Sequence, residues 1–209
     1  MDGSILFCGA FEGEVDIIKK YHSSNILITG VGSAESLFNL QYFLHHNKHI
    51  HSVVFVGSAG AYPHSTFKVG DFVYSNKFLS KDIAEIRGLA KVPAILKKSV
   101  ITNIDPRLKN LVLSNTIFSG TITNSTNYIT TVDLEMEELV NNLYDVGAEN
   151  MEVFSLAYAA YHLSVPFISL KVITNIVGKN GSAEWQKNWR ESSNQLQSVV
   201  LDFFSSFNY

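Results

Sequence analysis

Four apolar, strand-like runs in this chain each end in small or polar residues, and this pattern constrains the fold more than any other. Helix-like segments separate the runs, and such alternation indicates a largely parallel sheet covered on both faces. In a parallel sheet, ligands bind outside the carboxyl ends of the strands, where small residues let the backbone approach them closely. The four ends together therefore predict a pocket. They read Gly9-Ala10, Thr29-Gly30-Val31-Gly32, Gly57-Ser58-Ala59-Gly60 and Thr174-Asn175.

Periodicity and turn residues predict the elements, and the length of 209 residues suits one domain over residues 1–209. Strands are expected at 4–10, 25–32, 52–60, 68–78 and 166–174, with a strand or hairpin at 116–126. Helices are expected at 34–46 with Ser33 as N-cap, 105–115 with an aspartate cap, 133–147 closed by Gly147, 152–163, and 184–204. The segment 79–104 has weak periodicity and predicts an irregular excursion.

Composition excludes several classes of protein. With 46% hydrophobic residues, a net charge of -3 and only three arginines, the chain resembles neither a disordered protein nor a nucleic-acid binder. Its single cysteine, Cys8, excludes an intramolecular disulfide, and the apolar surroundings favour a buried, inert thiol. The N-terminus lacks the basic segment of a signal peptide, and no run approaches the ~20 apolar residues that cross a bilayer. We therefore expect a cytoplasmic protein without membrane contact.

Two glutamates stand out, and each allows two interpretations. Glu14 follows the first strand end, where it either stabilises a helix start electrostatically or faces a ligand. Glu152 begins an otherwise apolar helix, and its charge is costly to bury without a partner. It is either a helix-start acid or an acceptor for two vicinal hydroxyls, as on a ribose.

Other candidate motifs favour ordinary structural roles. The histidines between 45 and 51 sit at an expected helix end and show no metal-ligand spacing, so we expect no metal. Trp185 and Trp189, four residues apart, are expected to anchor the last helix in the core. The run around Ser58 lacks part of the G-x-S-x-G motif, which argues against a serine hydrolase. The run around Gly30 matches neither a dinucleotide fingerprint nor a P-loop.

Taken together, the motifs resemble the purine nucleoside phosphorylase / methylthioadenosine nucleosidase superfamily over nearly the whole chain. The segments that carry the resemblance are GAFEGEV, ITGVGSAES, VFVGSAGAYPHSTFKVGDFVYS and ENMEVFSLAYAAYHLSVPFISLKVITN. The resemblance implies a three-layer α/β/α sandwich with a central mixed, partly barrel-like sheet, which nucleosidases often assemble as a homodimer. It also implies cleavage of the N-glycosidic bond of a purine nucleoside, without a cofactor.

The resemblance assigns roles to five residues. Glu14 matches the glutamate that activates the attacking water, and Ser58 lies near the sugar and the water. Met151 and Glu152 match the ribose pair, with Glu152 accepting from the 2′ and 3′ hydroxyls. Asn175 falls where adenine-specific nucleosidases carry an aspartate that protonates the purine N7. An amide cannot donate a proton outright, but it can donate hydrogen bonds to O6 and N7 of a 6-oxopurine, the acceptor pair that arginine reads on guanine.

The segment TNIVGKN, followed by tryptophan, is similar to the pattern of futalosine hydrolases, which release hypoxanthine in an alternative menaquinone pathway. The expected activity is therefore hydrolysis of futalosine, with its carboxylated arm met by Lys81, Arg87 or Lys91 of the excursion or by a neighbouring subunit. Phosphorolysis is disfavoured because the phosphorylases bind phosphate with arginines, which are scarce here. The alternatives are an adenine-releasing nucleosidase acting on methylthioadenosine, S-adenosylhomocysteine or aminofutalosine, and a non-catalytic nucleoside-binding protein.

Overall fold

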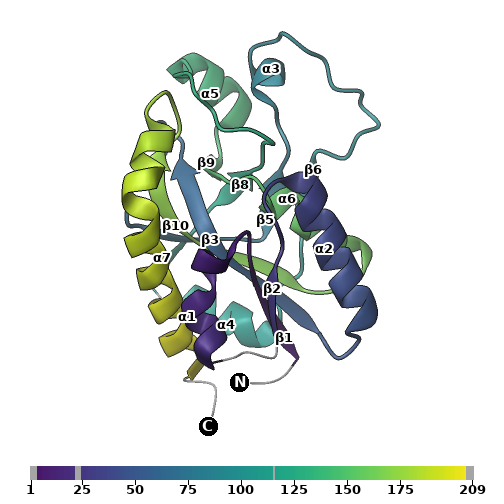
Figure 1. The fold of residues 1–209 in the computed structure, drawn as a ribbon. Helices are drawn as coiled ribbons and strands as arrows, with labels where there is room; N and C mark the ends of the chain where they lie inside the picture. The colour runs from purple at the N-terminus through teal and green to yellow at the C-terminus, as the bar shows by residue number, and fades with distance from the viewer. Residues whose placement is uncertain (1–3, 22–24, 115, 206–209) are drawn as a thin grey trace.

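The computed structural model describes residues 4–21, 25–114 and 116–205, and its strands and helices alternate along most of the chain (Figure 1). The strands are β1 Ile5–Gly9, β2 Ile26–Ile28, β3 Ser52–Ala61, β4 Phe72–Ser75, β5 Lys77–Leu79, β6 Ser99–Ile101, β7 Phe118–Gly120, β8 Ile122–Asn124, β9 Val146–Glu149 and β10 Phe167–Ile176. The helices are η1 Glu12–Glu14 (a 3-10 turn), α1 Asp16–Tyr21, α2 Ser33–His46, α3 Ile83–Ile86, α4 Pro106–Ser114, α5 Met136–Leu143, α6 Val153–His162 and α7 Gly181–Ser205.

The strands form one mixed sheet, as the resemblance implies. Its main path runs β6-β5-β8-β9-β3-β10-β4-β7, and β1 and β2 join at the side of β3. Six strand pairings are parallel and three are antiparallel. The long strands β3 and β10 pair in parallel, and both are almost completely buried. Strands buried on both faces need apolar side chains throughout, which explains the apolar runs in the sequence.

Helices cover both faces of the sheet, so the molecule has three layers (Figure 1). On one side α1, α4 and α7 pack against the sheet through a core that includes Phe7, Val56 and Leu196. On the other side α2 and α6 pack against it through a second core that includes Phe55 and Leu156. These two cores confirm the predicted α/β/α sandwich with a mixed central sheet. Cys8 is a buried free thiol in the second core, as its apolar surroundings predict.

Several predicted boundaries are wrong. The expected strand 68–78 is two strands, β4 and β5, which pair with different partners. The strands β7 and β8 within 116–126 also pair elsewhere and do not form a hairpin. Ser33 begins α2 but does not cap it, because the N-cap is Gly32, whose φ is 83°.

The expected helix 133–147 also ends early. Only Met136–Leu143 is helical, and Gly147 lies inside β9. A Cβ added at Gly147 would lie only 2.5 Å from the ring of Phe67. A glycine in a strand often marks such a close approach, which the interpretation as a helix end missed. The helix predicted at 105–115 is confirmed as α4, with the Asp105 carboxylate accepting from the Arg107 amide; Asn115 lies outside the described residues.

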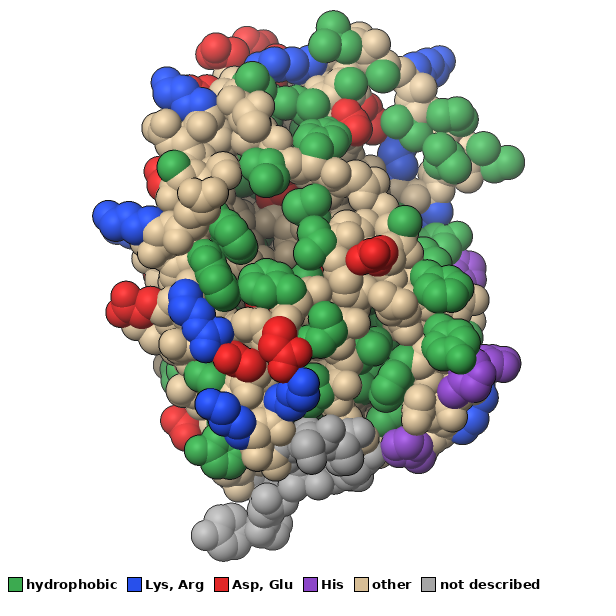
Figure 2. Space-filling model, viewed as in Figure 1, with side chains coloured by type: hydrophobic (Ala, Val, Ile, Leu, Met, Phe, Trp, Pro, Cys, Tyr) green, Lys and Arg blue, Asp and Glu red, His purple; other side chains and the backbone are tan. Residues whose placement is uncertain are grey.

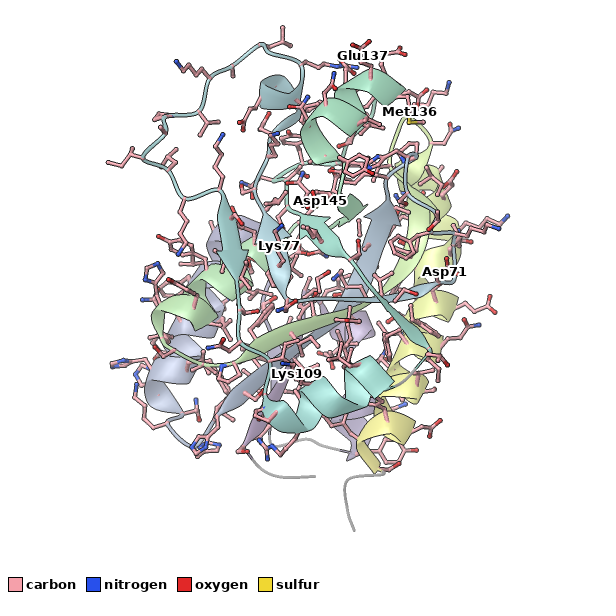
Figure 3. All side chains as sticks on the ribbon, turned by 180° about the vertical axis from the view of Figure 1, so that it is seen from behind. Asp71, Lys77, Lys109, Met136, Glu137 and Asp145 are labelled. Carbon is pink, nitrogen blue, oxygen red and sulfur yellow. The ribbon has the colours of Figure 1, made fainter. Side chains whose placement is uncertain are left out.

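Charged side chains lie mainly on the surface. Seen from behind, Lys77 and Asp145 face each other across a 3.5 Å ion pair (Figure 3). Exposed pairs of this kind contribute only about 0–1 kcal/mol to stability, so the fold depends on its apolar cores. Among the residues that the structure describes, no helix is both long and apolar enough to span a membrane.

Candidate active site

A cavity of about 270 Å³ lies at the carboxyl ends of the central strands, where the sequence predicts a pocket. It opens on the face shown in Figure 2, with hydrophobic side chains around the opening. All four predicted strand ends contribute to its wall. The wall comprises Ala10, Phe11, Glu14, Val31, Ser58, Ala59, Gly60, Tyr128, Ile129, Glu149, Asn150, Met151, Glu152, Asn175, Val177, Gly181, Ser182 and Trp185.

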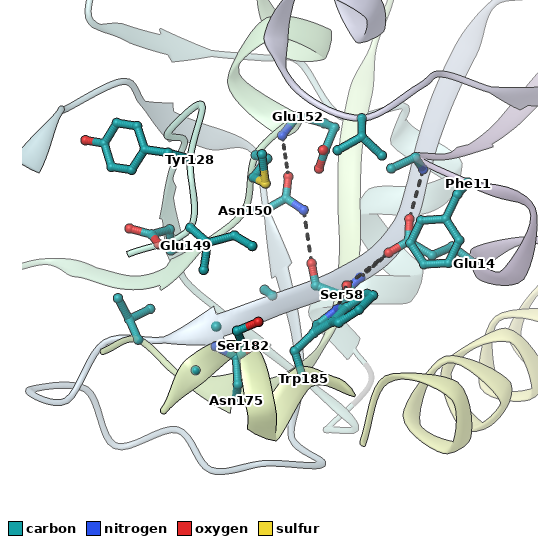
Figure 4. Close-up of a pocket in the computed structure, with 18 residues that line it drawn as sticks. Phe11, Glu14, Ser58, Tyr128, Glu149, Asn150, Glu152, Asn175, Ser182 and Trp185 are labelled. Atoms are coloured by element: carbon teal, nitrogen blue, oxygen red, sulfur yellow. Dashed lines mark hydrogen bonds between the residues drawn. The ribbon is translucent and has the colours of Figure 1, made fainter. Parts of the chain in front are cut away.

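The carboxylate of Glu14 is held at the cavity wall by three donors from neighbouring segments (Figure 4). Its Oε2 accepts from the Ala10 amide at 2.8 Å, and its Oε1 accepts from the amide and hydroxyl of Ser58 at 2.9 and 3.0 Å. Gly57 makes room for it, because a Cβ there would lie 3.0 Å from Oε2. A carboxylate has about four acceptor positions, so one remains for a ligand or water.

The pKa of Glu14 is raised to about 7, first because the side chain is buried and second because the charge of Glu152 repels its own. The hydrogen bonds from Ser58 and Ala10 favour the charged form but do not cancel these effects. A buried carboxyl with a pKa near neutrality is suited to exchange a proton with a reactant. Glu14 is therefore no simple helix-start acid.

Ser58 connects Glu14 to the rest of the site. Its hydroxyl donates to Glu14 and accepts from the indole Nε1 of Trp185 at 3.2 Å. Its carbonyl accepts from Nδ2 of Asn150 at 3.0 Å (Figure 4). Trp185 is thus not merely a core anchor, as the sequence suggested, because it lines the cavity and fixes the direction of the Ser58 hydroxyl.

Glu152 lies at the start of α6, with its side chain in the cavity wall and only 4% exposed. The Glu152 side chain makes no capping bond; the side-chain oxygen Oδ1 of Asn150 accepts from the backbone amides of Glu152 and Val153 instead. Its Oε1 accepts from the Gly32 amide at 2.9 Å. Burial raises its pKa, and that hydrogen bond lowers it in part. Met151 lies beside it in the wall, as expected for the predicted pair.

Asn175 lies at the end of β10, where a register shift between Ile173 and Asn175 pairs it with Gly60 of β3. Such a bulge re-aims side chains, and here Asn175 rather than Thr174 stands opposite Gly60. The Thr174 hydroxyl lies within hydrogen-bond distance of two acceptors, Oδ1 of Asn175 at 3.0 Å and the carbonyl of Ala59 at 3.2 Å. The amide nitrogen is left with a long 3.4 Å contact to the carbonyl of Ile176, so it can donate into the cavity.

Glu149 is a third carboxylate of the wall, which sequence reasoning missed. It accepts from the Tyr62 hydroxyl at 2.7 Å and from the Thr130 hydroxyl at 3.1 Å. Burial raises its pKa, while these hydrogen bonds oppose the shift. A signal existed, because Glu149 precedes Glu152 by three residues in ENME, but the sequence predicted no strand at 146–149.

The structure brings together all five residues predicted for the site: Glu14, Ser58, Met151, Glu152 and Asn175. The described part of the wall contains three glutamates and no lysine, arginine or histidine. The cations expected from the 79–92 excursion do not reach it; Lys81 donates to Asn142, and Arg87 pairs with Glu138. No group of three or more potential metal ligands occurs among the described residues.

Comparison with known proteins decides the family. A model of the phosphorylase superfamily matches residues 14–205, which is nearly the whole chain. The chain belongs to the phosphorylase superfamily. This superfamily member is 25% identical over 171 residues to the 5′-methylthioadenosine/S-adenosylhomocysteine nucleosidase of Psychromonas ingrahamii, a match that spans 75% of this chain and 70% of the relative.

Solved structures share the fold of this phosphorylase superfamily member. The 5′-methylthioadenosine/S-adenosylhomocysteine nucleosidase of Streptococcus pneumoniae, solved with a transition-state inhibitor, superposes with a TM-score of 0.80 at 15% identity, covering 98% of this chain and 99% of that one. The futalosine hydrolase of Helicobacter pylori superposes with a TM-score of 0.79 at 15% identity, covering 97% of each chain. At this identity the likeness establishes the fold alone, and it confirms the nucleoside phosphorylase-like architecture.

Proposed function

We propose that this phosphorylase superfamily member is a nucleosidase, which hydrolyses the N-glycosidic bond of a purine nucleoside. The observation that carries the proposal is the buried carboxylate pair Glu14 and Glu152 on a cavity wall whose described residues include no cationic side chain. Met151 and Glu152 bind the ribose, with Glu152 accepting from its vicinal hydroxyls. Ser58 lies near the sugar and the water, and Asn175 faces the base.

The mechanism follows from the charges that develop as the bond breaks. Positive charge accumulates on the ribose and negative charge on the departing base, and the enzyme must stabilise both. Glu152 stabilises the cationic sugar, while Glu14 accepts a proton from a water on the opposite face. A general base of this kind typically contributes about 10²–10⁴-fold to the rate. The amide of Asn175 stabilises the leaving base by donating hydrogen bonds.

Hydrolysis is favoured over phosphorolysis by the charge of the wall. A phosphate anion would have to lie among the carboxylates of Glu14, Glu149 and Glu152, with no positive side chain of the described wall to stabilise it. In a low-dielectric cavity such like-charge contacts are strongly unfavourable. A neutral water meets no such barrier.

The leaving base proposed for the main reaction is a 6-oxopurine, as in the release of hypoxanthine from futalosine. The amide nitrogen of Asn175 makes only a long 3.4 Å contact with the carbonyl of Ile176, so it is able to donate to the base. A 6-oxopurine offers O6 and N7 side by side as acceptors for it. Such a base also leaves as an anion more readily than adenine, which benefits from the proton that an amide cannot supply.

The second candidate is an adenine-releasing nucleosidase acting on methylthioadenosine or S-adenosylhomocysteine. It is favoured by the 25% identity with the nucleosidase of Psychromonas ingrahamii. The H. pylori and S. pneumoniae structures do not separate the two candidates, since both share only the fold.

The test uses substrate pairs that differ only at position 6 of the purine, namely futalosine with aminofutalosine and 5′-methylthioinosine with 5′-methylthioadenosine. Chromatography of the released base should show faster release of hypoxanthine than of adenine from each pair. Adenine release alone would establish the second candidate. The variant Glu14→Gln should abolish turnover while largely sparing the affinity for the nucleoside. If the unmutated protein binds these nucleosides but turns over none of them, it is a nucleoside-binding protein instead.

A further inference from the structure

We infer that the last helix, α7, positions the proposed water-activating residue Glu14 through the backbone carbonyl of Gly13. Gln197 and Ser193 of α7 are the positioning residues, and neither belongs to the cavity wall. This inference rests on the proposed nucleosidase function and adds to it the contacts that keep Glu14 in place. Its support comes from hydrogen bonds to one carbonyl, from close packing of α7 on the turn, and from a second attachment of α7 at the base side.

Three side chains of α7 donate to the carbonyl oxygen of Gly13. The distances are 2.9 Å from Ser193 Oγ, 3.1 Å from Gln197 Nε2 and 3.1 Å from Arg190 Nη1. Their spacing of three and then four residues places them on one face of the helix. Ser193 and Gln197 are only 2% and 0% exposed, so bulk water does not compete for their bonds. A carbonyl oxygen has two lone pairs, so three donors hold it more firmly than its burial alone requires.

This carbonyl belongs to the peptide group that leads into Glu14. Because a peptide group is planar, fixing its carbonyl also fixes its N–H, which is the N–H of Glu14. That N–H donates to the carbonyl of Phe11 at 3.1 Å, so the peptide plane is held at both ends. The plane sets the direction in which the Glu14 side chain leaves the backbone. Helix α7 therefore holds the start of this side chain, while Ala10 and Ser58 hold its carboxylate.

Gln197 also holds the backbone that follows Glu14. Its Oε1 accepts from the amides of Ile17 and Ile18 at 2.8 and 3.3 Å. These amides lie in the first turn of α1, where backbone N–H groups have no partner within the helix. A single buried side chain thus bonds to Gly13 on one side of Glu14 and to Ile17 on the other.

The turn lies directly against α7 because Gly13 has no side chain. A Cβ at Gly13 would lie only 2.8 Å from the ring of Trp189, so that one of the two would have to move. The ring of Phe11 packs on the same indole, with ring centres 5.3 Å apart. Figure 1 shows α7 running beside α1, which follows this turn. Packing and hydrogen bonds therefore hold the same turn against the same helix.

The same helix is attached to the strand end on the base side of the cavity. Nδ2 of Asn188 donates to the carbonyl of Thr174 at 2.9 Å, and Oε2 of Glu184 accepts from the amide of Ile176 at 2.8 Å. Thr174 and Ile176 flank Asn175, which faces the base in the proposed function. One helix therefore holds the backbone on the water side and on the base side, and it fixes their separation.

A purely structural role for Gln197 is the competing explanation. Loss of a buried, hydrogen-bonded amide lowers stability in any case, and less folded protein lowers the measured rate. The midpoint of a pH profile separates the two explanations, because it does not depend on the concentration of folded enzyme. The hydrogen bonds from Ser58 and Ala10 hold the pKa of Glu14 below the value that burial would give it. A Glu14 side chain that moves away from these donors should therefore titrate at higher pH.

The first variant is Gln197→Met, which keeps the length of the side chain but removes its amide. We expect kcat to fall about 10–100-fold, because a misplacement of ~1 Å costs a reacting group about 10²-fold. KM should stay nearly unchanged, since Glu14 acts on the water, and the midpoint of the kcat/KM profile should move to higher pH. Gln195→Met is the matched control, because Gln195 is exposed on the same helix and its amide lies 3.5 Å from Glu191.

The second variant, Ser193→Ala, removes one donor and leaves the bonds of Gln197 to α1 intact. Alanine has the highest helix propensity, so this variant should fold. We expect kcat to fall about 2–10-fold, as for the loss of one hydrogen bond, with a pH shift in the same direction. Ser198→Ala is its matched control, since the Ser198 hydroxyl donates to the carbonyl of Asn194 on the exposed side of α7. Val200→Ala removes buried apolar packing of α7 without removing a hydrogen bond, so it should leave the pH midpoint in place.

The assays use the substrate that the unmutated protein cleaves fastest, and circular dichroism at each pH restricts the comparison to folded protein. If Gln197→Met does not fold, Ser193→Ala decides alone. A pH midpoint that stays in place in the folded variants would overturn the positioning role while the nucleosidase function stands. If the unmutated protein cleaves no purine nucleoside, the proposed function fails and this inference fails with it.

Discussion

At the scale of single residues, the charge of Glu14 decides how the proposed activity depends on pH. Burial and the charge of Glu152 raise the pKa of Glu14 to about 7. A base must be unprotonated to accept a proton from water, so kcat/KM should rise as the pH increases through about 7. In Glu152→Gln the repulsion is lost, and the rise should move to lower pH even though the rate falls. A pH profile whose midpoint stays in place would show that Glu152 does not influence Glu14.

The same shift affects stability in the opposite direction. The pKa of Glu14 is higher in the folded protein than the ordinary value of 4.5, so the folded state holds its proton more tightly. The contribution of Glu14 to stability is therefore complete below about pH 4.5 and is lost as the pH rises through about 7. The proposed catalytic pH thus lies where Glu14 destabilises the fold, a cost common at functional sites.

Lys171 gives a second pH dependence, of opposite sign. Its ammonium is fully buried on β10 and donates to the hydroxyls of Ser75 and Ser169, at 3.2 and 2.5 Å. Burial lowers its pKa from 10.5 to about 7. Between these values the unfolded chain binds one more proton than the folded protein, so the free energy of unfolding rises by ~1.4 kcal/mol per pH unit from this group.

We predict that Lys171→Met removes this part of the pH dependence and stabilises the protein at pH 7. Urea unfolding at several pH values between 7 and 9 measures it, and the difference between the variant and the unmutated protein isolates Lys171 from other titrating groups. Lys109→Met is the control, since Lys109 is exposed on α4 (Figure 3). A variant whose unfolding free energy keeps the original slope would contradict the lowered pKa.

At the scale of elements, β9 depends on a glycine that the sequence alone misplaces. A Cβ at Gly147 would lie 2.5 Å from both the Phe67 ring and the Thr121 hydroxyl, and the Gly147 amide donates to that hydroxyl at 3.1 Å. We predict that Gly147→Ala lowers the free energy of unfolding by about 1–3 kcal/mol through overpacking. Thermal or urea unfolding measures the loss.

A double-mutant cycle supplies the control for Gly147. Phe67→Ala removes one of the two close neighbours, so Gly147→Ala should cost less in that background than in the unmutated protein. Equal costs in the two backgrounds would mean that Phe67 does not limit the space at Gly147.

The elements also show which parts of the fold a sequence can predict. Burial of whole faces produces the long apolar runs of β3 and β10 and the helical spacing of apolar residues in α2 and α6. Sequence periodicity therefore identifies these four elements. The β4–β5 break and the end of α5 depend on partners far along the chain, as in the pairing of β4 with β10 and β7. Local pattern carries little of that information, because packing overrides propensity in short elements.

The same distinction applies to the candidate site. Glu14, Ser58 and Asn175 follow strand ends, so the rule for parallel sheets predicts that they meet. Glu149 arrives through β9, a strand that the sequence did not predict, and Trp185 arrives from a helix whose tryptophans look like ordinary core residues. The missed residues reach the cavity through tertiary contacts, which their own sequence neighbourhoods do not encode.

At the scale of the whole molecule, exposed apolar side chains lie over both α2 and the excursion. Phe38 and Tyr42 on α2 stack with ring centres 6.1 Å apart while remaining 64% and 59% exposed. Leu89 and Ile95 of the excursion are 78% and 93% exposed, and Figure 2 shows hydrophobic side chains over the excursion and α2 on the same side. Large exposed apolar patches mark interaction surfaces. We expect this side to form the interface of the homodimer predicted from the sequence.

The dimer prediction can be tested by light scattering after size-exclusion chromatography, where the protein should have twice the mass of one chain. The double variant Phe38→Glu, Ile95→Glu should be monomeric, because two charges would be buried without partners in the interface. Leu113→Glu is the matched control, since Leu113 is 58% exposed on α4, which packs on the opposite face of the sheet.

Val31 borders the cavity directly before α2, so a dimer through this side would cover part of the cavity opening. The monomeric variant should therefore show a higher KM with unchanged folding, whereas a dimer that survives both charges would place the interface elsewhere.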